Sequence, residues 1–155
     1  MTKKILVADD ELPIREWLKI IIEKNCPDTT VQTATNGSDA LELYRRGKHD
    51  IIFTDIKMPR MDGLKLVEHI RELDATPYIV ILTNYSDFEY ARTAFANNVN
   101  DYILKSEING DMLSRIISQA AKVQPAAKAV STVSVNEFIN TIGVSDVPET
   151  SVPLP

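Results

Sequence analysis

The stretch Ile51-Ile-Phe-Thr-Asp-Ile-Lys-Met-Pro-Arg-Met-Asp-Gly63 decides which fold the sequence is expected to adopt. Its first four residues are apolar or β-branched, which is typical of a strand buried on both faces. Asp55 follows them directly, and Pro59 and Gly63 then mark a loop. In an open α/β sheet, functional residues lie just beyond the carboxyl ends of the strands. The stretch therefore predicts a buried strand with a functional carboxylate at its end.

Four other strand-like runs alternate with helical patterns, at residues 4–8, 30–35, 78–82 and 102–104. The run at 30–35 is the most polar, so we expect it at the edge of the sheet. The helix after the first strand is expected to place one set of apolar residues on one face: Ile14, Trp17, Leu18, Ile21 and Ile22. This alternation predicts an α/β fold, a parallel sheet with helices on both faces. Right-handed crossovers favour the doubly wound, flavodoxin-like strand order 2-1-3-4-5.

Local signals predict where several helices begin and end. Pro13 is expected in the first turn of the first helix. Ser38 is expected to cap the second helix and Gly47 to end it. The run Ser86-Asp-Phe-Glu89 resembles a capping box that opens the fourth helix.

Length and composition limit the classes of protein that the chain can belong to. Its 155 residues allow one domain with a core and a short appendage, and its net charge of −5 argues against direct binding to nucleic acid. No apolar run approaches the roughly 18 residues of a membrane span. With a single cysteine, Cys26, the chain has no internal disulfide, and we expect a cytoplasmic protein without membrane contact. His49 and His69 are expected to be solvated surface residues.

Polar residues stand at four of the five predicted strand ends, and the fold brings these ends to one crevice: Asp9, Asp10, Glu11, Asp55, Thr83 and Lys105. Crowded carboxylates repel one another, and oxygen ligands of this kind favour Mg²⁺. Asp55, on the central strand, is the best candidate for a nucleophile toward phosphorus. Each residue alone could instead be a helix cap or a solvated charge, but their convergence favours a functional site.

With these residues in these positions, the sequence resembles the receiver domain of bacterial two-component response regulators, over roughly residues 3–122. The matching features include the Asp9-Asp10-Glu11 cluster and the loop from Asp55 to Gly63, followed in order by Thr83, Tyr102 and Lys105. The resemblance implies that Asp55 is the phosphoacceptor of a phosphorelay and forms an aspartyl phosphate. The donor would be a sensor histidine kinase.

The resemblance also implies a Mg²⁺ site. Asp10 and Asp55 would bind the ion through their side chains, and the backbone carbonyl of Lys57 would join them. Asp9 would act mainly through a water molecule.

A switch is implied by the same resemblance. Thr83 would move toward the phosphoryl group, the ring of Tyr102 would follow inward, and Lys105 would pair with the phosphoryl oxygens. The protein would then be a signalling switch and not an enzyme, catalysing only its own phosphorylation and dephosphorylation. A homodimer through the face of the fourth helix, fifth strand and fifth helix would be one possible partner arrangement.

Two segments, 83–91 and 101–105, resemble more narrowly the receivers attached to AraC-type DNA-binding domains. The implied output is control of transcription, with DNA bound only through an output domain that this chain does not contain.

The sequence departs from the receiver pattern at three places. Ser106 stands where receivers usually have a proline in a cis peptide bond; a cis bond before a non-proline costs about 2.5–4 kcal/mol, so we expect a trans Lys105–Ser106 bond. Such a bond could re-aim Lys105. Asn84 replaces a commonly small residue, and Asn97-Asn98 stands where a glycine often ends the fourth helix.

Two other functions remain open at this point. An aspartyl-nucleophile phosphatase would need an acid two residues after Asp55, where this chain has Lys57. A phosphate-independent interaction module is made less plausible by the intact set of site residues, although Ser106 keeps it open.

The last part of the chain, 123–155, differs in composition from the receiver-like part, 1–122. It contains four of the eight prolines, and only four of its 33 residues are charged. Most of it is expected to be a linker or tail. The segment 135–143 is either part of that linker or a short helix that docks on the domain or on a neighbouring subunit.

Overall fold

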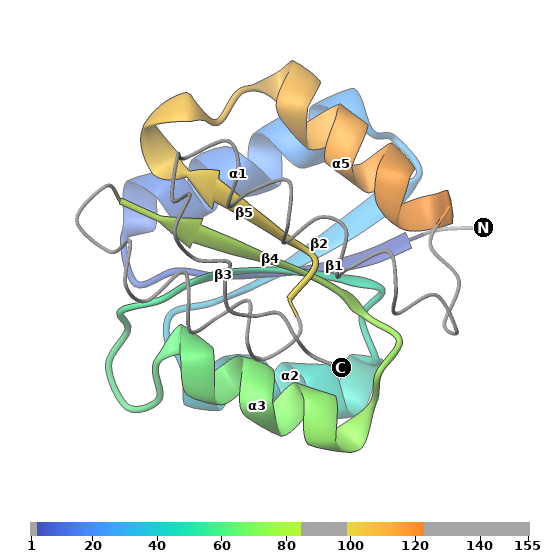
Figure 1. Ribbon diagram of the computed structural model, residues 1–155. Helices are drawn as coiled ribbons and strands as arrows, with labels where there is room; N and C mark the ends of the chain where they lie inside the picture. Colours follow the sequence, from blue (N-terminus) through green and yellow to red (C-terminus); the bar gives the residue numbers. More distant parts are fainter. Residues whose placement is uncertain (1–2, 85–98, 123–155) are drawn as a thin grey trace, which may run out of the picture.

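The computed structural model describes residues 3–84 and 99–122, and the statements below concern that part of the chain. Its centre is a five-stranded parallel sheet in the order β2-β1-β3-β4-β5 (Figure 1). The strands are β1 (Lys3–Ala8), β2 (Thr29–Ala34), β3 (Ile51–Asp55), β4 (Tyr78–Thr83) and β5 (Asp101–Leu104). The predicted fold class, strand order and edge position of the second strand are therefore confirmed.

Helices cover both faces of the sheet. Figure 1 shows α1 (Leu12–Asn25) and α5 (Gly110–Lys122) on one face, and α2 (Gly37–Gly47) and α3 (Gly63–Leu73) on the other. A short 3₁₀ turn, η2 (Lys105–Glu107), lies between β5 and α5 in the chain. None of the helices in the described ranges is long and apolar enough to cross a membrane.

The core consists of two apolar layers, one on each side of the sheet. In β1, Ile5 and Val7 pack with α1 and α5, whereas Leu6 and Ala8 pack with α2 and α3. Successive side chains of a strand point to opposite faces, so a strand between two helical layers must be apolar at nearly every position. This is the physical reason for the near-continuous apolar runs in the sequence.

The start of α2 differs from the prediction. The N-cap is Asn36, whose side chain accepts a hydrogen bond from the Asp39 N–H at 2.8 Å, so the expected cap at Ser38 is wrong. The helix begins at Gly37, where the backbone N–H donates to the carbonyl oxygen of Met61 at 2.9 Å. A Cβ at Gly37 would collide with that oxygen, so the close approach of the loop before α3 fixes where α2 starts.

Two other side chains are placed differently from expectation. His49 is buried between α2 and β3 and not solvated, because its Nε2 lies 2.7 Å from Oε1 of Gln32 on the edge strand. Trp17 was expected on the buried face of α1, but it is 37% exposed, while Leu18 and Ile22 are fully buried.

Pro13 lies in the first turn of α1 and Gly47 is the last residue of α2, as predicted. The expected capping box at 86–89, the pair Asn97-Asn98, and the whole of 123–155 with its possible helix at 135–143 lie outside the described residues.

Candidate functional site

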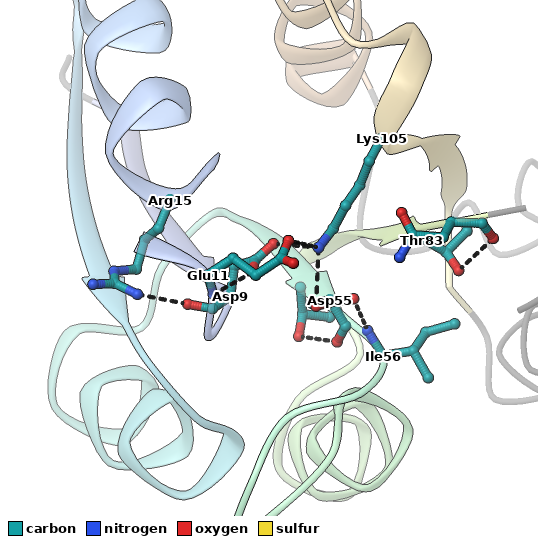
Figure 2. Close-up of polar contacts among 9 residues, drawn as sticks. Asp9, Glu11, Arg15, Asp55, Ile56, Thr83 and Lys105 are labelled. Carbon is teal, nitrogen blue, oxygen red and sulfur yellow. Dashed lines mark hydrogen bonds and ion pairs between the residues drawn. The ribbon is translucent and has the colours of Figure 1, made fainter. Parts of the chain in front are cut away.

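The predicted site residues lie together at the carboxyl-terminal end of the parallel strands. Asp9 follows β1, Asp55 ends β3, Thr83 ends β4 and Lys105 follows β5. Figure 2 shows the Lys105 side chain reaching from the end of β5 toward Asp9, Glu11 and Asp55.

The ammonium group of Lys105 lies among three carboxylates. Its Nζ is 3.0 Å from Asp55 Oδ2 and 3.1 Å from Glu11 Oε1, and it donates a hydrogen bond to each. It also lies 2.9 Å from Asp9 Oδ2, as an ion pair. An ammonium has three N–H donors, so three close carboxylate oxygens match its capacity.

The Asp55 carboxylate is oriented by the backbone that follows it. Its Oδ1 accepts a hydrogen bond from the Ile56 N–H at 2.7 Å, and the side chain is almost fully buried. The loop then folds back, because the Gly63 N–H donates to the Ile56 carbonyl oxygen at 2.7 Å. A Cβ at Gly63 would collide with the carbonyl oxygen of Asp55, so this return requires glycine.

The Asp9 carboxylate is fully buried and tied to the start of α1. Its Oδ1 accepts a hydrogen bond from the Glu11 N–H at 2.9 Å. The Arg15 guanidinium donates to the Asp9 backbone carbonyl at 2.9 Å. These contacts leave Oδ2 directed at Lys105 as an ion pair, without a hydrogen-bond partner among the described residues.

One carboxylate oxygen from each of Asp9, Asp10 and Asp55 lies within 4.8 Å of the other two. Asp10 is exposed, whereas the other two are buried. A set of hard oxygen donors at this spacing fits Mg²⁺, which is bound by one or two carboxylates and completes its octahedron with water or phosphate oxygens. The donor set therefore suits a divalent cation.

Burial and crowding shift the protonation equilibria of the site. Burial, followed by the charge of Asp9, raises the pKa of Asp55 to about 6, although Lys105 and the Ile56 N–H oppose this shift. Burial also raises the pKa of Asp9 against the effect of Lys105. The two carboxylates in turn raise the pKa of Lys105 despite its burial. Lys105 therefore stays protonated and positively charged, and the carboxylates carry negative charge that a bound cation would stabilise.

Thr83 lies beside this cluster in Figure 2, and Tyr102 lies on β5, the strand next to β4. Thr83 is fully buried, and its hydroxyl donates to the Asn84 carbonyl oxygen at 3.2 Å. Tyr102 is half-buried on β5 and packs against the apolar layer beneath α2 and α3. Lys57 is exposed in the loop after Asp55.

The Lys105–Ser106 peptide bond is trans, as predicted, because the described residues contain no cis peptide bond. Lys105 begins the η2 turn and still reaches Asp55. The trans bond therefore does not turn Lys105 away from the cluster.

Two contributors were missed by sequence reasoning. Glu11 was recognised as part of an acidic run but not as a partner of Lys105, and Arg15 was not singled out. The position of Glu11 beside Asp9 and Asp10 was a usable signal. Nothing in the local sequence indicates that Arg15 holds the Asp9 carbonyl.

Comparisons of the sequence and of the fold with known proteins give consistent results. The model of the response regulator receiver domain family matches residues 5–117. An uncharacterized response regulatory protein of Staphylococcus epidermidis is 42% identical over 103 residues, which are 66% of this chain and 40% of that protein. The transcriptional regulatory protein HptR of Staphylococcus aureus is 40% identical over the same shares of both chains. This chain thus spans about 40% of the length of these curated relatives.

Among solved structures, the receiver (REC) domain of AraT, a response regulator from Geobacillus stearothermophilus, superposes with a TM-score of 0.71. It is 36% identical, and the match covers 77% of this chain and 93% of that one. The similarity covers both the fold and a substantial part of the sequence.

Proposed function

The chain belongs to the response regulator receiver domain family, a family of signalling domains and not of metabolic enzymes, and on that basis we propose that Asp55 is its phosphoacceptor. The contact of Lys105 Nζ with Asp55 Oδ2 at 3.0 Å carries this proposal, because it sets a cation beside the one carboxylate that ends the central strand. The phosphoryl donor would be a sensor histidine kinase.

The phosphoryl transfer requires few steps from the protein. A carboxylate oxygen of Asp55 forms a bond to phosphorus while the bond from phosphorus to the leaving group breaks, and the leaving group departs with the electron pair. Lys105 then pairs with the phosphoryl oxygens, and the Thr83 hydroxyl donates to another of them. Water attack on the same phosphorus would reverse the modification, so the domain would catalyse only its own phosphorylation and dephosphorylation.

Mg²⁺ would be bound by the side chains of Asp10 and Asp55 and the carbonyl of Lys57, with Asp9 acting through a water molecule. The close spacing of carboxylate oxygens from Asp9, Asp10 and Asp55 supports this proposal. When bound, the ion would neutralise phosphoryl oxygens during transfer. The chain itself would position the carboxylates and keep Asp55 oriented through the Ile56 N–H.

Phosphorylation of Asp55 would change the structure at the edge of the sheet formed by β4 and β5. The added charge would draw Thr83 toward Asp55, and Tyr102 would follow because it lies on the strand next to β4. The resulting change would alter the face that includes β5 and α5, which would pair with an output domain or a second copy of the chain. The relative HptR is named a transcriptional regulatory protein, which supports a role of this chain in the control of transcription. From the narrower resemblance of residues 83–91 and 101–105 we propose that the output domain is of the AraC type and that the protein acts in the cytoplasm.

Substitution of the phosphoacceptor tests the assignment. Wild type incubated with acetyl phosphate and Mg²⁺ should gain one phosphoryl group by intact-protein mass spectrometry, and Asp55→Asn should gain none. Asp62→Asn is the matched control, because Asp62 lies in the same loop and caps α3 through the Lys65 N–H, a role that asparagine also fills. Labelling of Asp55→Asn at the wild-type rate would refute the proposal.

The same experiment addresses the other functions. A wild-type protein that stays unlabelled by acetyl phosphate and by any kinase would favour a phosphate-independent interaction module. Turnover of small phosphoesters would favour a phosphatase. The sequence argues against that function, because the position two residues after Asp55 is Lys57 and not an acid.

A further inference from the structure

Glu11 occupies the N-cap position of α1 but does not cap the helix. Its side chain makes no capping hydrogen bond, and the residue is not of the types preferred at an N-cap. Instead the carboxylate reaches Lys105 at 3.1 Å, from a residue 94 positions away in the sequence. A residue that departs from the usual N-cap preference and instead makes a long-range contact at a site is a candidate for a functional role.

The three acidic partners of Lys105 are not equally able to leave it. The Asp9 side chain is fully buried, and its other oxygen is held by the Glu11 N–H. Asp55 is nearly buried and would itself carry the phosphoryl group. The Glu11 side chain is 62% exposed, so its carboxylate can turn into water at little cost.

A new acceptor on Asp55 has to compete with these partners. Lys105 has three N–H donors, and three carboxylate oxygens already surround them. Phosphoryl oxygens therefore compete with these carboxylates for the Lys105 ammonium, and the exposed Glu11 carboxylate is the one most easily released.

The Glu11 carboxylate is also exposed beside the nearly buried Lys105 ammonium. With Lys105 it borders an open groove between α1 and the loop after β5, whose other lining residues are Pro13, Ile14, Trp17 and Ile108. A negative charge beside Lys105 repels an incoming phosphate dianion.

We infer that the Glu11 carboxylate competes with the phosphoryl group for Lys105 and slows the phosphorylation of Asp55. Glu11 is thus a positioning residue that acts through Lys105, and the inference rests on the proposed function of Asp55. Lys105 keeps its contacts with Asp9 and Asp55 when Glu11 withdraws, so loss of the Glu11 charge should speed the transfer and not disable it.

The test compares Glu11→Gln with wild type at saturating Mg²⁺, using acetyl phosphate as donor. Asp55 attacks phosphorus and acetate leaves with the electron pair, so no proton needs to be moved. We expect Glu11→Gln to be phosphorylated about two- to fivefold faster, the factor that corresponds to an exposed ion pair. The difference should shrink as salt is added, because salt screens exposed charges.

Glu16→Gln is the matched control, because it removes the same charge from an exposed glutamate further along α1. It should leave the rate within error of wild type. A second measurement does not depend on activity: ¹⁵N relaxation of the Lys105 ammonium in metal-free protein should show greater mobility in Glu11→Gln. That change reports loss of the contact, which an effect on folding alone would not produce.

The outcomes separate the two proposals. Equal rates for wild type and Glu11→Gln, or an equal acceleration by Glu16→Gln, would overturn the role of Glu11 alone. Absence of any labelling in wild type would overturn the phosphoacceptor assignment and the role of Glu11 with it.

Discussion

The Lys105 side chain reaches Asp55, with its Nζ 3.0 Å from Oδ2, although the peptide bond between Lys105 and Ser106 is trans. The cluster of carboxylates holds the ammonium in place, so the direction of the side chain is set by attraction to Asp9 and Asp55 as much as by the backbone. A proline after the lysine is therefore not required for the lysine to reach the site.

At the same scale, His49 is a buried histidine that burial makes harder to protonate. Its Nε2 lies 2.7 Å from Gln32 Oε1, and its Nδ1 is buried with no hydrogen-bond partner in the part of the chain that the structure describes. Burial, followed by the charge of Lys4, lowers the pKa of His49 below its usual value, and Asp50 only partly opposes this. The folded protein therefore takes up a proton on His49 less readily than the unfolded chain does.

This shift predicts a pH dependence of stability. Below a pH of about 6.5, the unfolded chain binds a proton that folded His49 does not, so the free energy of unfolding should fall as the pH falls. Asp55, whose pKa is raised to about 6, takes up its proton more readily in the folded state and therefore acts in the opposite direction. The test is the difference between the two proteins: in urea unfolding at pH values between about 5 and 7.5, the slope that His49 contributes should be present in wild type and absent in His49→Gln.

His69→Gln is the control for that experiment. His69 is partly exposed on α3, with Nδ1 3.9 Å from Glu72 Oε1, so its replacement should leave most of the slope. An unchanged slope in His49→Gln would contradict the assignment of the effect to His49.

At the scale of elements, α1 protects the open edge of the sheet. β2 is an edge strand, and the outward backbone groups of Val31 are both bonded to side chains of α1. Lys19 Nζ donates to the Val31 carbonyl oxygen at 3.1 Å, and the Val31 N–H donates to Glu23 Oε2 at 3.2 Å. Unpaired edge backbone is a template for association between molecules, and covering it is a known defence.

Removal of this cover should have two effects. The double variant Lys19→Ala/Glu23→Ala should unfold with a free energy lower by about 1 kcal/mol, since two backbone groups lose their partners. It should also self-associate at concentrations where wild type does not, which sedimentation velocity at several concentrations would detect.

A matched pair exists on α2. Arg46 and Glu42 form an ion pair of the same i,i+4 kind at 3.0 Å, on a more exposed surface. Glu42→Ala/Arg46→Ala should lose less stability and should not associate. Equal behaviour of the two double variants would mean that the contacts with Val31 do not protect the edge.

At the scale of the whole molecule, the fold gathers negative charge at one end of the sheet. Asp9, Asp10 and Asp55 come from two strands, and β1 and β3 are neighbours only because the strand order reverses there. Apolar layers on both faces hold these strands in place, so the folded state must accommodate the repulsion between the carboxylates.

A divalent cation should therefore stabilise the folded protein. Mg²⁺ at tenfold its dissociation constant should add about 1.4 kcal/mol to the free energy of unfolding and raise the melting temperature in wild type. Asp10→Asn should lose most of this gain, whereas Asp28→Asn, an exposed residue just before β2, should retain it. Calorimetric melting with Mg²⁺ and with a chelator would decide; equal gains in both variants would contradict the proposed site.

Much of the fold could be predicted because its signals are local. Each strand lies within one residue of its expected bounds, since burial on both faces leaves a continuous apolar run that polar loops interrupt. The failures involve contacts between distant segments. Asn36 caps α2 in place of Ser38, and the Gly37 N–H at the start of this helix donates to the carbonyl oxygen of the distant Met61. His49 is buried, and its Nε2 lies within hydrogen-bond distance of Oε1 of Gln32 on the edge strand.

The sequence by itself determined the strands, their order and the identity of the residues at their carboxyl ends, because apolar periodicity and chain connectivity restrict these strongly. Only the tertiary structure decided how those residues meet. The three carboxylates around Lys105, the pKa of Asp55 raised to about 6 and the role of Glu11 as a competitor all depend on distances between segments up to 94 residues apart. Charge interactions and desolvation act through space, so they emerge only when the chain has folded.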